Sequence, residues 1–358
     1  MSAELVAKII SQGERLATHS WEYGAFSEAL LEWYNPNYSV FGNNTFPDGK
    51  VPVLQIDQVR SLSYAEPHIW TNSTTLVDGD GATGDPASLG VSAILIGQTQ
   101  PEYLSAADRQ VQHLLTSVPR WSNGAISQRE SAAELWADFV YMAPPTLAYW
   151  AVQSNDEGLL RTAIEQCTLY RDVLGTPASA ASGGGLWHHI VGPQSQDLGL
   201  WSTGNAWAAA GSTRVLATAA RSRFASSSAV VAGLAKLRTL IREILDGAIA
   251  ADDAEPDEPL LRNYLNDTSW FGELSGTALL AATAYRAAAL APAEFGQKHI
   301  EWADRKREEV TKRVGGDGLL APVINPLNWG DRTPAKESPE AQSFAVLMFA
   351  AHRDFNAK

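Results

Sequence analysis

Hydrophobic positions recur along most of this 358-residue chain at the three- and four-residue spacing of amphipathic helices. Polar stretches rich in Gly, Asn, Pro or Ser interrupt this pattern at residues 35–52, 77–86 and 175–185, which we interpret as loops. No segment shows the sustained alternation of a strand, so the sequence predicts an all-α protein. The predicted helices span residues 2–18, 22–34, 55–65, 86–98, 104–118, 130–151, 155–174, 203–222, 228–249, 269–290, 292–313 and 339–354.

The predicted helices follow one another in pairs. Two of them contain Ala-rich stretches with little charge, 206–219 and 275–290, which are apolar almost all round. Helices of that kind must be enclosed, and pairs arranged as an inner and an outer ring would enclose them. Since no linker separates two compact halves, we predict a single domain over residues 1–358.

Composition narrows the range of partners. Hydrophobic residues make up 45% of the chain and charged residues 19%, and the net charge is −13 without any Lys/Arg cluster. Nucleic acid is therefore not an expected partner, because phosphate binding needs a basic surface. No apolar run approaches the roughly 20 residues of a membrane span. The single cysteine, Cys167, excludes an internal disulfide and is expected to be a buried, inert thiol.

The N-terminal segment is amphipathic and carries an acid early, unlike a signal peptide, so the chain as given is expected to be cytoplasmic. Four glycosylation-type sequons, at Asn37, Asn43, Asn72 and Asn266, leave open a secreted protein whose leader is not part of this chain. A monomer or a weak homodimer is expected.

Asp138 is the most unusual acid in the sequence. In the predicted helix 130–151, Glu130, Glu134 and Asp138 are four residues apart and would share one face. The neighbours of Asp138 from Leu135 to Met142 are almost all apolar. A carboxyl group in such surroundings either has a partner, which makes it structural, or keeps its proton and can donate it near neutral pH. Both interpretations stay open on the residues alone.

The positions of the tryptophans indicate that the loops form a binding site. Twelve tryptophans are many for this length, and half of them stand at helix starts or in polar connections. Packing under a loop explains any one of them, but the set is typical of a carbohydrate cleft, where flat rings cover sugar faces. These six are Trp21, Trp121, Trp187, Trp201, Trp207 and Trp329.

Four motifs give the chain a resemblance to a known family. GAISQR (124–129), ELWADFVYMAPPTLA (134–148), GLWHHI (185–190) and WSTGNAWAAAG (201–211) occur in the order found in glycoside hydrolase family 105. That family contains the unsaturated rhamnogalacturonyl hydrolases and belongs to the six-hairpin glycosidases, and the resemblance covers roughly residues 80–350. It implies an (α/α)6 barrel of six helical hairpins. No cofactor is expected, and no metal either, because the adjacent His188 and His189 would point apart and make a poor chelate.

The resemblance also implies a reaction. Its substrate is an oligosaccharide released by a polysaccharide lyase, which ends in a uronic acid with a C4=C5 double bond. One aspartic acid protonates C4 and helps water to add at C5, after which the hemiketal collapses and frees the neighbouring sugar. Asp138 matches this general acid/base, and Asp85 matches a second acid near the substrate, although Asp85 followed by Pro86 also reads as a plain helix cap.

The resemblance assigns further positions to the substrate site. His189 matches a substrate histidine better than His188 does, Trp201 and Trp207 match aromatic positions that flank the sugar, and Asn205 could bind a hydroxyl. The neighbouring motif residues, and one of the loop tryptophans, complete the predicted set of substrate-binding residues: Gln128, Arg129, Trp136, Met142 and Thr203 from the motifs, and Trp329 from the loops.

Two positions depart from the family pattern. Relatives often have an Arg at the position of Thr203 and a His at that of Gln128. Threonine cannot replace the paired donors of an Arg on a carboxylate, so Arg129 or another cation must hold the uronate, or the substrate differs. Two other functions also stay open. One is a conventional glycosidase that uses Asp138 with Asp267 or Glu273, and the other is a non-catalytic sugar-binding barrel.

Overall fold

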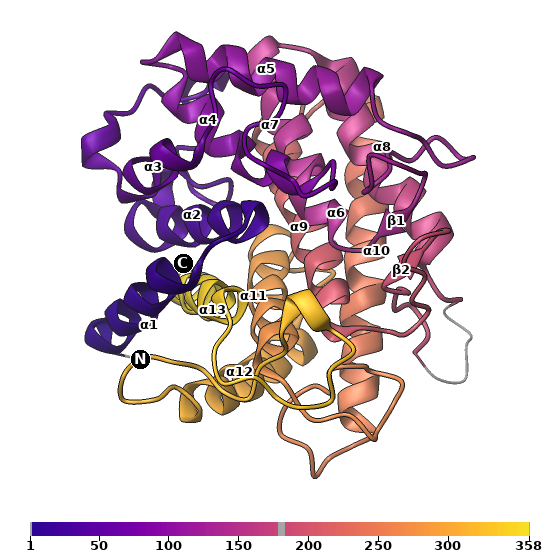
Figure 1. Cartoon of the computed structure of the whole chain (residues 1–358). Helices are drawn as coiled ribbons and strands as arrows, with labels where there is room; N and C mark the ends of the chain where they lie inside the picture. The colour runs from indigo at the N-terminus through magenta and orange to yellow at the C-terminus, as the bar shows by residue number, and fades with distance from the viewer. Residues whose placement is uncertain (1, 178–182, 358) are drawn as a thin grey trace.

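A computed structural model describes residues 2–177 and 183–357 and shows an (α/α)6 barrel (Figure 1). Six helices form the inner ring, in which each packs against the next and α13 closes the ring on α2. They are α2 (Ser20–Tyr34), α4 (Gly90–Ile96), α7 (Pro144–Ser154), α9 (Ser202–Arg221), α11 (Leu274–Leu290) and α13 (Pro339–Asn356). The all-α prediction and the paired inner and outer helices are confirmed.

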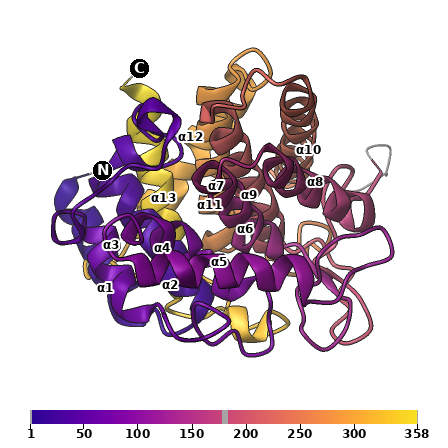
Figure 2. The ribbon, with the colours of Figure 1, turned by 90° about the horizontal axis from the view of Figure 1, so that it is seen from above.

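The outer ring consists of the helices that alternate with these along the chain. They are α1 (Ala3–Leu16), α3 (Arg60–Ala65), α5 (Pro101–Thr116), α8 (Glu157–Leu174), α10 (Ser228–Asp253) and α12 (Gln297–Lys312). In the view from above, α9 and α11 lie near the middle of the molecule and α8 and α10 toward its edge (Figure 2). No helix in the described part of the chain is long and apolar enough to cross a membrane.

The Ala-rich sequences occupy the inner ring, as their low charge predicts. Almost every residue of α9 and α11 is buried, whereas α12 buries only one stripe of its surface. Small side chains let the inner helices approach closely. At Gly211 of α9, a Cβ atom would lie 2.5 Å from the Cα of Tyr141 on the short helix α6 (Phe139–Met142), so only glycine fits there.

The helix predicted over residues 130–151 is wrong in its first half. Residues 130–134 are irregular, Leu135–Trp136 form strand β1, and helical structure begins only at α6. Pro144 and Pro145 then separate α6 from α7, because proline lacks the N–H that would continue the earlier helix. Glu130, Glu134 and Asp138 therefore do not share a helix face.

Other boundaries differ by a few residues. The helix predicted from residue 269 begins at Leu274, and the one predicted from 292 begins at Gln297. The stretches 55–65 and 86–98 each start as a 3-10 turn before their α-helix. Residues 178–182 of the loop predicted over 175–185 lie outside the described residues. The remaining short elements are strand β2 (Ile190–Val191) and the 3-10 helices η1 (Pro36–Tyr38), η2 (Pro47–Gly49), η3 (Ile56–Gln58), η4 (Glu66–His68), η5 (Asp85–Leu89) and η6 (Pro326–Asn328).

Cys167 lies in the core, on the inward side of α8, as the sequence predicts. Burial raises the pKa of its thiol to about 12, so it stays protonated and unreactive at neutral pH.

Candidate active site

The loops at one end of the barrel enclose a cavity of about 760 Å³, counting the open space at its mouth. Residues from η5, from the segment before α6, from the loops before α9 and α13, and from α2 and α13 themselves line it. Nine of the twelve predicted site residues are among them: Asp85, Gln128, Arg129, Trp136, Asp138, Met142, His189, Trp201 and Trp329. Segments more than 200 residues apart in sequence thus converge on one site.

A two-residue antiparallel sheet places the two central side chains. Strand β1 pairs with β2, with Trp136 opposite Ile190, and the N–H of Ala137 donates to the carbonyl of His189 at 2.9 Å. This pairing fixes the backbone just before Asp138 beside that of His189. The side chains follow: Asp138 Oδ2 lies 3.5 Å from His189 Nε2, an ion-pair distance rather than a close hydrogen bond.

His189 is held between two carboxylates. Its Nδ1 lies 3.0 Å from Asp197 Oδ2, opposite the contact to Asp138, and the hydroxyl of Tyr264 donates to the same Asp197 oxygen. Burial opposes a charge on the imidazole, but the adjoining Asp138 and Asp197 outweigh it and raise the pKa of His189. Asp138, whose side chain is 14% exposed, therefore does have an ion-pair partner, a histidine that can carry a proton.

Three indole rings surround this histidine. Trp201, Trp329 and Trp136 have ring centroids 4.4, 5.2 and 5.8 Å from the imidazole. Two of their N–H groups are anchored away from the cavity, Trp136 on Glu134 at 2.7 Å and Trp201 on Asn263 at 2.8 Å. The rings are therefore held in place, with apolar surface beside the acid as a sugar-binding site requires.

Asp85 opens η5 and faces the cavity instead of capping a helix. Its side chain makes no capping hydrogen bond, and Gln128 Nε2 donates to its Oδ1 at 2.7 Å. Burial, and in smaller part the charge of Asp138, raise the pKa of Asp85 to about 7 in spite of that hydrogen bond. The helix-cap interpretation is thus wrong, and the cavity contains a second acid that is half-protonated near neutral pH.

Arg129 is a cation without an assigned partner in this wall. Arg129 lines the cavity with its guanidinium 5.9 Å from the ring centre of Trp136, and this guanidinium takes part in none of the ion pairs or hydrogen bonds among the described residues. The turn at Gly81, whose φ of +77° favours glycine, leaves space for that guanidinium: a Cβ there would come within 3.0 Å of it. Arg129 is free to bind an anion.

Four buried polar atoms in the cavity wall have no hydrogen-bond partner among the described residues. They are Gln128 Oε1, Asp138 Oδ2, His189 Nε2 and Glu340 Oε2. Buried polar groups are nearly always paired, and leaving one unpaired costs about 1–3 kcal/mol. Such a cluster in one wall is expected where a ligand supplies the missing partners.

Three predicted residues do not reach the cavity. Asn205 ties two loops together, since its amide bonds the N–H and C=O of Trp187 and the C=O of Trp201. Trp207 is fully buried between Tyr141 and other core side chains. Thr203 is also buried, and its hydroxyl donates to Glu273 at 3.3 Å. Their predicted contacts with a sugar are therefore corrected to structural roles.

The two acids proposed for a conventional glycosidase also lie elsewhere. Glu273 caps α11, where it accepts from the N–H groups of Ser275 and Gly276, and Asp267 is exposed and paired with Arg332. Neither lines the cavity. His188 points away from His189 and contacts the carbonyl of Leu198, as expected for adjacent residues. Among the described residues, no group of three His, Cys, Asp or Glu side chains is arranged to hold a metal.

Sequence reasoning missed Glu340, Asp197 and Tyr264. Glu340 follows Ser338 and Pro339 at the start of α13, where an acid is ordinary in a first helical turn, so it carries no signal of its own. Asp197 and Tyr264 stand in loops without a motif. Trp21 belongs to the predicted set of loop tryptophans but carried no assigned role, and it lines the cavity.

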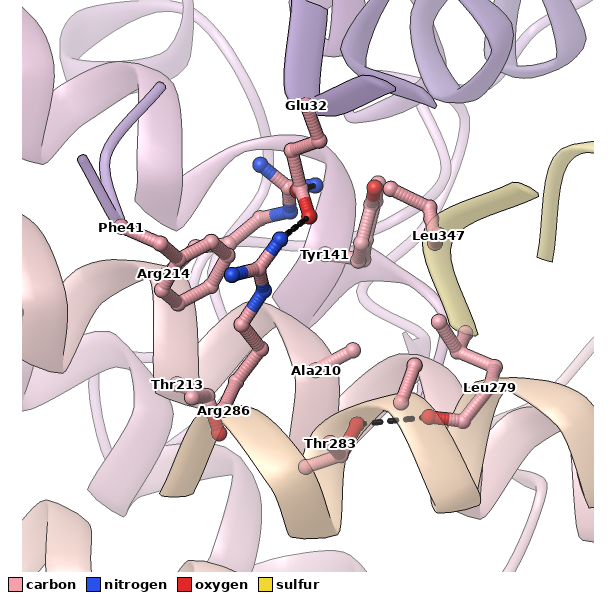
Figure 3. A pocket seen from close by; sticks show the side chains of 11 residues that line it. Glu32, Phe41, Tyr141, Ala210, Thr213, Arg214, Leu279, Thr283, Arg286 and Leu347 are labelled. Atoms are coloured by element: carbon pink, nitrogen blue, oxygen red, sulfur yellow. Dashed lines mark hydrogen bonds and ion pairs between the residues drawn. The ribbon is translucent and has the colours of Figure 1, made fainter. Parts of the chain in front are cut away.

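A second, smaller cavity lies deeper in the barrel (Figure 3). Arg286 of α11 reaches Glu32 of α2 at 2.6 Å beside the ring of Phe41, and Arg214 of α9 binds Glu28 at 2.9 Å. Arg214 is twelve residues beyond the start of α9, about 18 Å along the helix from the first cavity. Because its charges are paired with one another, we interpret this cluster as an ion network that joins inner helices.

Comparison with known sequences gives the family. The sequence model of Glycosyl Hydrolase Family 88 matches residues 11–224, more than half of the chain. The chain belongs to glycosyl hydrolase family 88. This family 88 protein is a hydrolase. The matched residues contain all the residues that line the cavity except Pro326, Leu327, Trp329 and Glu340. No curated protein sequence matches the chain.

Solved structures share the fold of the family 88 protein. A possible family 105 member from Salmonella enterica serovar Paratyphi A is 16% identical, with a TM-score of 0.73 over 98% of this chain and 93% of that one. A family 105 glycoside hydrolase from C. acetobutylicum is 12% identical, with a TM-score of 0.73 over 98% and 99%. An unsaturated glucuronyl hydrolase specific for heparin is 11% identical, with a TM-score of 0.66 over 99% and 96%. These likenesses agree with the family 105 resemblance of the motifs.

Proposed function

We propose that this family 88 protein removes a 4,5-unsaturated uronic acid from the non-reducing end of lyase-generated pectic, rhamnogalacturonan-type oligosaccharides. The reaction would be hydration of the vinyl ether, with Asp138 as general acid/base. The observation that carries the proposal is the position of Asp138: this residue lines the cavity, and its Oδ2 has no hydrogen-bond donor and lies 3.5 Å from a histidine that can share a proton with it.

The pair of Asp138 and His189 can serve both steps of a hydration. With one proton between them, Asp138 can deliver that proton to C4 of the double bond, which leaves positive charge at C5. Water then adds to C5 and returns its proton to Asp138, so the pair is restored. The hemiketal formed at C5 collapses and releases the neighbouring sugar. No second carboxylate needs to attack the anomeric carbon.

The cavity can accept an acidic sugar only if some of its carboxyl groups are protonated. Asp85, Asp138 and Glu340 would repel a uronate if all were ionised. Burial raises the pKa of Asp85 to about 7 and that of Glu340 well above its ordinary value, which limits the negative charge. Arg129, which has no ion-pair partner among the described residues, supports the proposal as the cation that holds the uronate carboxylate in place of the family Arg.

A conventional glycosidase is the less supported function, because Asp267 and Glu273 lie outside the cavity. The other alternative, a sugar-binding protein without activity, is tested by the same experiment as the proposal itself.

The substitution Asp138→Asn tests the proposal. It keeps the size and the apolar contacts of the side chain but removes the transferable proton. We expect kcat to fall by about 10²- to 10⁴-fold while substrate still binds.

The assay follows the ultraviolet absorbance of the conjugated enol acid in lyase-digested rhamnogalacturonan, which disappears on hydration. Asp172→Asn, an exposed acid on α8, is the matched control and should leave the rate unchanged. Thermal melting shows that each variant is folded. If the natural protein leaves this absorbance unchanged on lyase products of pectin, the proposal is wrong; binding that survives without turnover would favour the sugar-binding alternative.

A further inference from the structure

Glu340 lines the cavity and has an unpaired carboxyl oxygen. It stands in the first turn of α13 with only 2% of its surface exposed. The indole N–H of Trp21 on α2 donates to its Oε1 at 2.8 Å, and Trp21 lines the same cavity. Its Oε2 is buried and has no hydrogen-bond partner among the described residues. One oxygen of this carboxyl is thus anchored, and the other lacks a partner in the protein.

The surroundings of Glu340 favour its neutral form. Burial, and next the negative charge of Asp138, raise the pKa of Glu340 well above its ordinary value, and only the hydrogen bond from Trp21 opposes them appreciably. The other charged groups that act on it are Glu22 of α2 and Glu273 at the start of α11, both acids. No basic group is among the main causes of this shift; His19, just before α2, contacts Glu22 at 3.3 Å, and Arg129 and His189 line the same cavity.

A protonated carboxyl in this geometry can donate a hydrogen bond. Its Oε1 accepts from Trp21, so a proton on the carboxyl is expected on Oε2, where it makes a hydrogen-bond donor that has no partner among the described residues. We propose that Glu340 is a substrate-binding residue whose Oε2–H donates a hydrogen bond to an oxygen of the bound sugar. This inference rests on the proposed function, and it adds a specificity-determining residue that lies outside the matched family segment.

The alternative is that Glu340 acts only on α13, as a negative side chain in the first turn of a helix. That role requires the ionised form and predicts a loss of stability, but no change in substrate binding, when the charge is removed. The two roles can be separated because glutamine reproduces the neutral acid: its Oε1 accepts from Trp21 and its Nε2 donates toward the cavity.

Steady-state kinetics on lyase-digested rhamnogalacturonan form the first test. Glu340→Ala removes the donor and should raise KM about tenfold with little change in kcat, which is the expected loss for one hydrogen bond to an unpaired group. Glu340→Gln should keep the KM of the natural protein at neutral pH. Glu337→Gln, an exposed acid three residues away that pairs with Arg15, is the matched control and should have no effect.

The pH dependence gives a readout that a structural role would not change. At high pH the natural protein loses the Oε2 proton, so KM should rise, whereas KM of Glu340→Gln should not rise for this reason. Asp85 titrates in both proteins, and the difference between the two profiles belongs to Glu340. A KM for Glu340→Ala equal to that of the natural protein, in an enzyme that turns over its substrate, would overturn this inference and leave the proposed function intact.

A spectroscopic test does not depend on turnover. The infrared difference between the natural protein and Glu340→Gln at neutral pH should contain the C=O stretch of a protonated carboxyl. An ionised carboxylate band in that difference would refute the inference even if no substrate has been found. Absence of turnover on every lyase product, together with a protonated Glu340, would instead reject the proposed function and, with it, the sugar as the partner of this donor.

Discussion

Replacing Asp197 by asparagine tests whether His189 shares the catalytic proton. Three donors converge on the Asp197 carboxylate: His189 Nδ1 at 3.0 Å, the N–H of Gly199 at 2.9 Å and the hydroxyl of Tyr264. Asparagine keeps the shape of the side chain and one accepting oxygen, but it removes the negative charge. The proton shared by Asp138 and His189 then loses the carboxylate that stabilises it from the far side of the imidazole.

The pKa of Asp197 gives the magnitude. Although burial opposes it, the contacts with His189 and Tyr264 lower this pKa from 3.8 to about 2. That difference corresponds to about 2 kcal/mol in favour of the charged form, of which His189 supplies the larger part. By reciprocity the carboxylate stabilises the proton on the Asp138–His189 pair by a similar amount. We expect Asp197→Asn to lower the apparent pKa of that pair by about one unit.

The assay is the pH profile of kcat/KM on lyase-digested rhamnogalacturonan. Activity requires one proton on the pair, so it falls when that proton is lost, and the alkaline limb should move to lower pH by about one unit. On that limb the variant should be about tenfold slower than the natural protein. The same contact also affects stability. Because the pKa of Asp197 is lower in the folded protein than in the unfolded one, its charged form stabilises the fold above pH 3.8. The difference in unfolding free energy between the natural protein and the variant should vanish as the pH falls toward 2.

Asp246→Asn is the matched control, because Asp246 also contacts a histidine, His299 at 3.2 Å, but lies outside the cavity. Its pH profile should equal that of the natural protein. A loss of activity in Asp197→Asn that is the same at every pH would refute the reasoning, since it would mean that Asp197 only holds the loop in place.

Three further changes have defined outcomes. Arg129→Ala should raise KM for the unsaturated uronate about ten- to hundredfold with little change in kcat, measured by steady-state kinetics, because it removes the charged donor for the carboxylate. Asn205→Ala should lower the free energy of unfolding by about 2–3 kcal/mol in denaturant titration, since it leaves the backbone of buried Trp187 unpaired. Glu32→Gln should cost about 3–5 kcal/mol in the same titration, because it leaves the buried Arg286 without the closer of its two carboxylates.

Each of these has a control and a contrary outcome. Arg332→Ala, an exposed arginine over Trp270, should not change KM, and an unchanged KM for Arg129→Ala would require another anchor for the carboxylate. Asn356→Ala, at the exposed end of α13, should cost far less than Asn205→Ala. A Glu32→Gln protein as stable as the natural one would mean that the deeper cluster is solvated and that its charges contribute little.

The sequence predicts the barrel well because its determinants are local. The Ala-rich, weakly charged segments that become α9 and α11 can only be stable inside, and the amphipathic helices between them can only cover an inner ring. The stretch before α6 was mispredicted because its acids have helical spacing. Pairing of Trp136 with Ile190 overrides that pattern, and this contact joins residues 54 positions apart.

Some residues of the candidate site could be predicted from the sequence and others could not. Asp138, His189 and Arg129 stand in motifs, so they could be named from the sequence and they do converge. Asn205 stands in an equally clear motif but folds inward, because the loops of Trp187 and Trp201 need its amide. No local pattern separates a motif residue that binds a ligand from one that holds the loops. Glu340, by contrast, stands in no motif and yet lines the cavity, because the packing of α13 against α2 brings it there.

The balance of charge in the cavity finally decides what it can bind. A wall with Asp85, Asp138 and Glu340, and with Asp80 beside them, would repel any anion if these acids kept their ordinary pKa values, because one charge on Arg129 cannot balance them. Enclosure in the barrel raises the pKa of Glu340 well above its ordinary value and that of Asp85 to about 7, and the adjoining carboxylates of Asp138 and Asp197 raise the pKa of His189. Binding of a uronate should therefore weaken as the pH rises above 7 and Asp85 ionises. The apolar interior thus both holds the indole rings and makes an acid-rich site able to accept an acidic sugar.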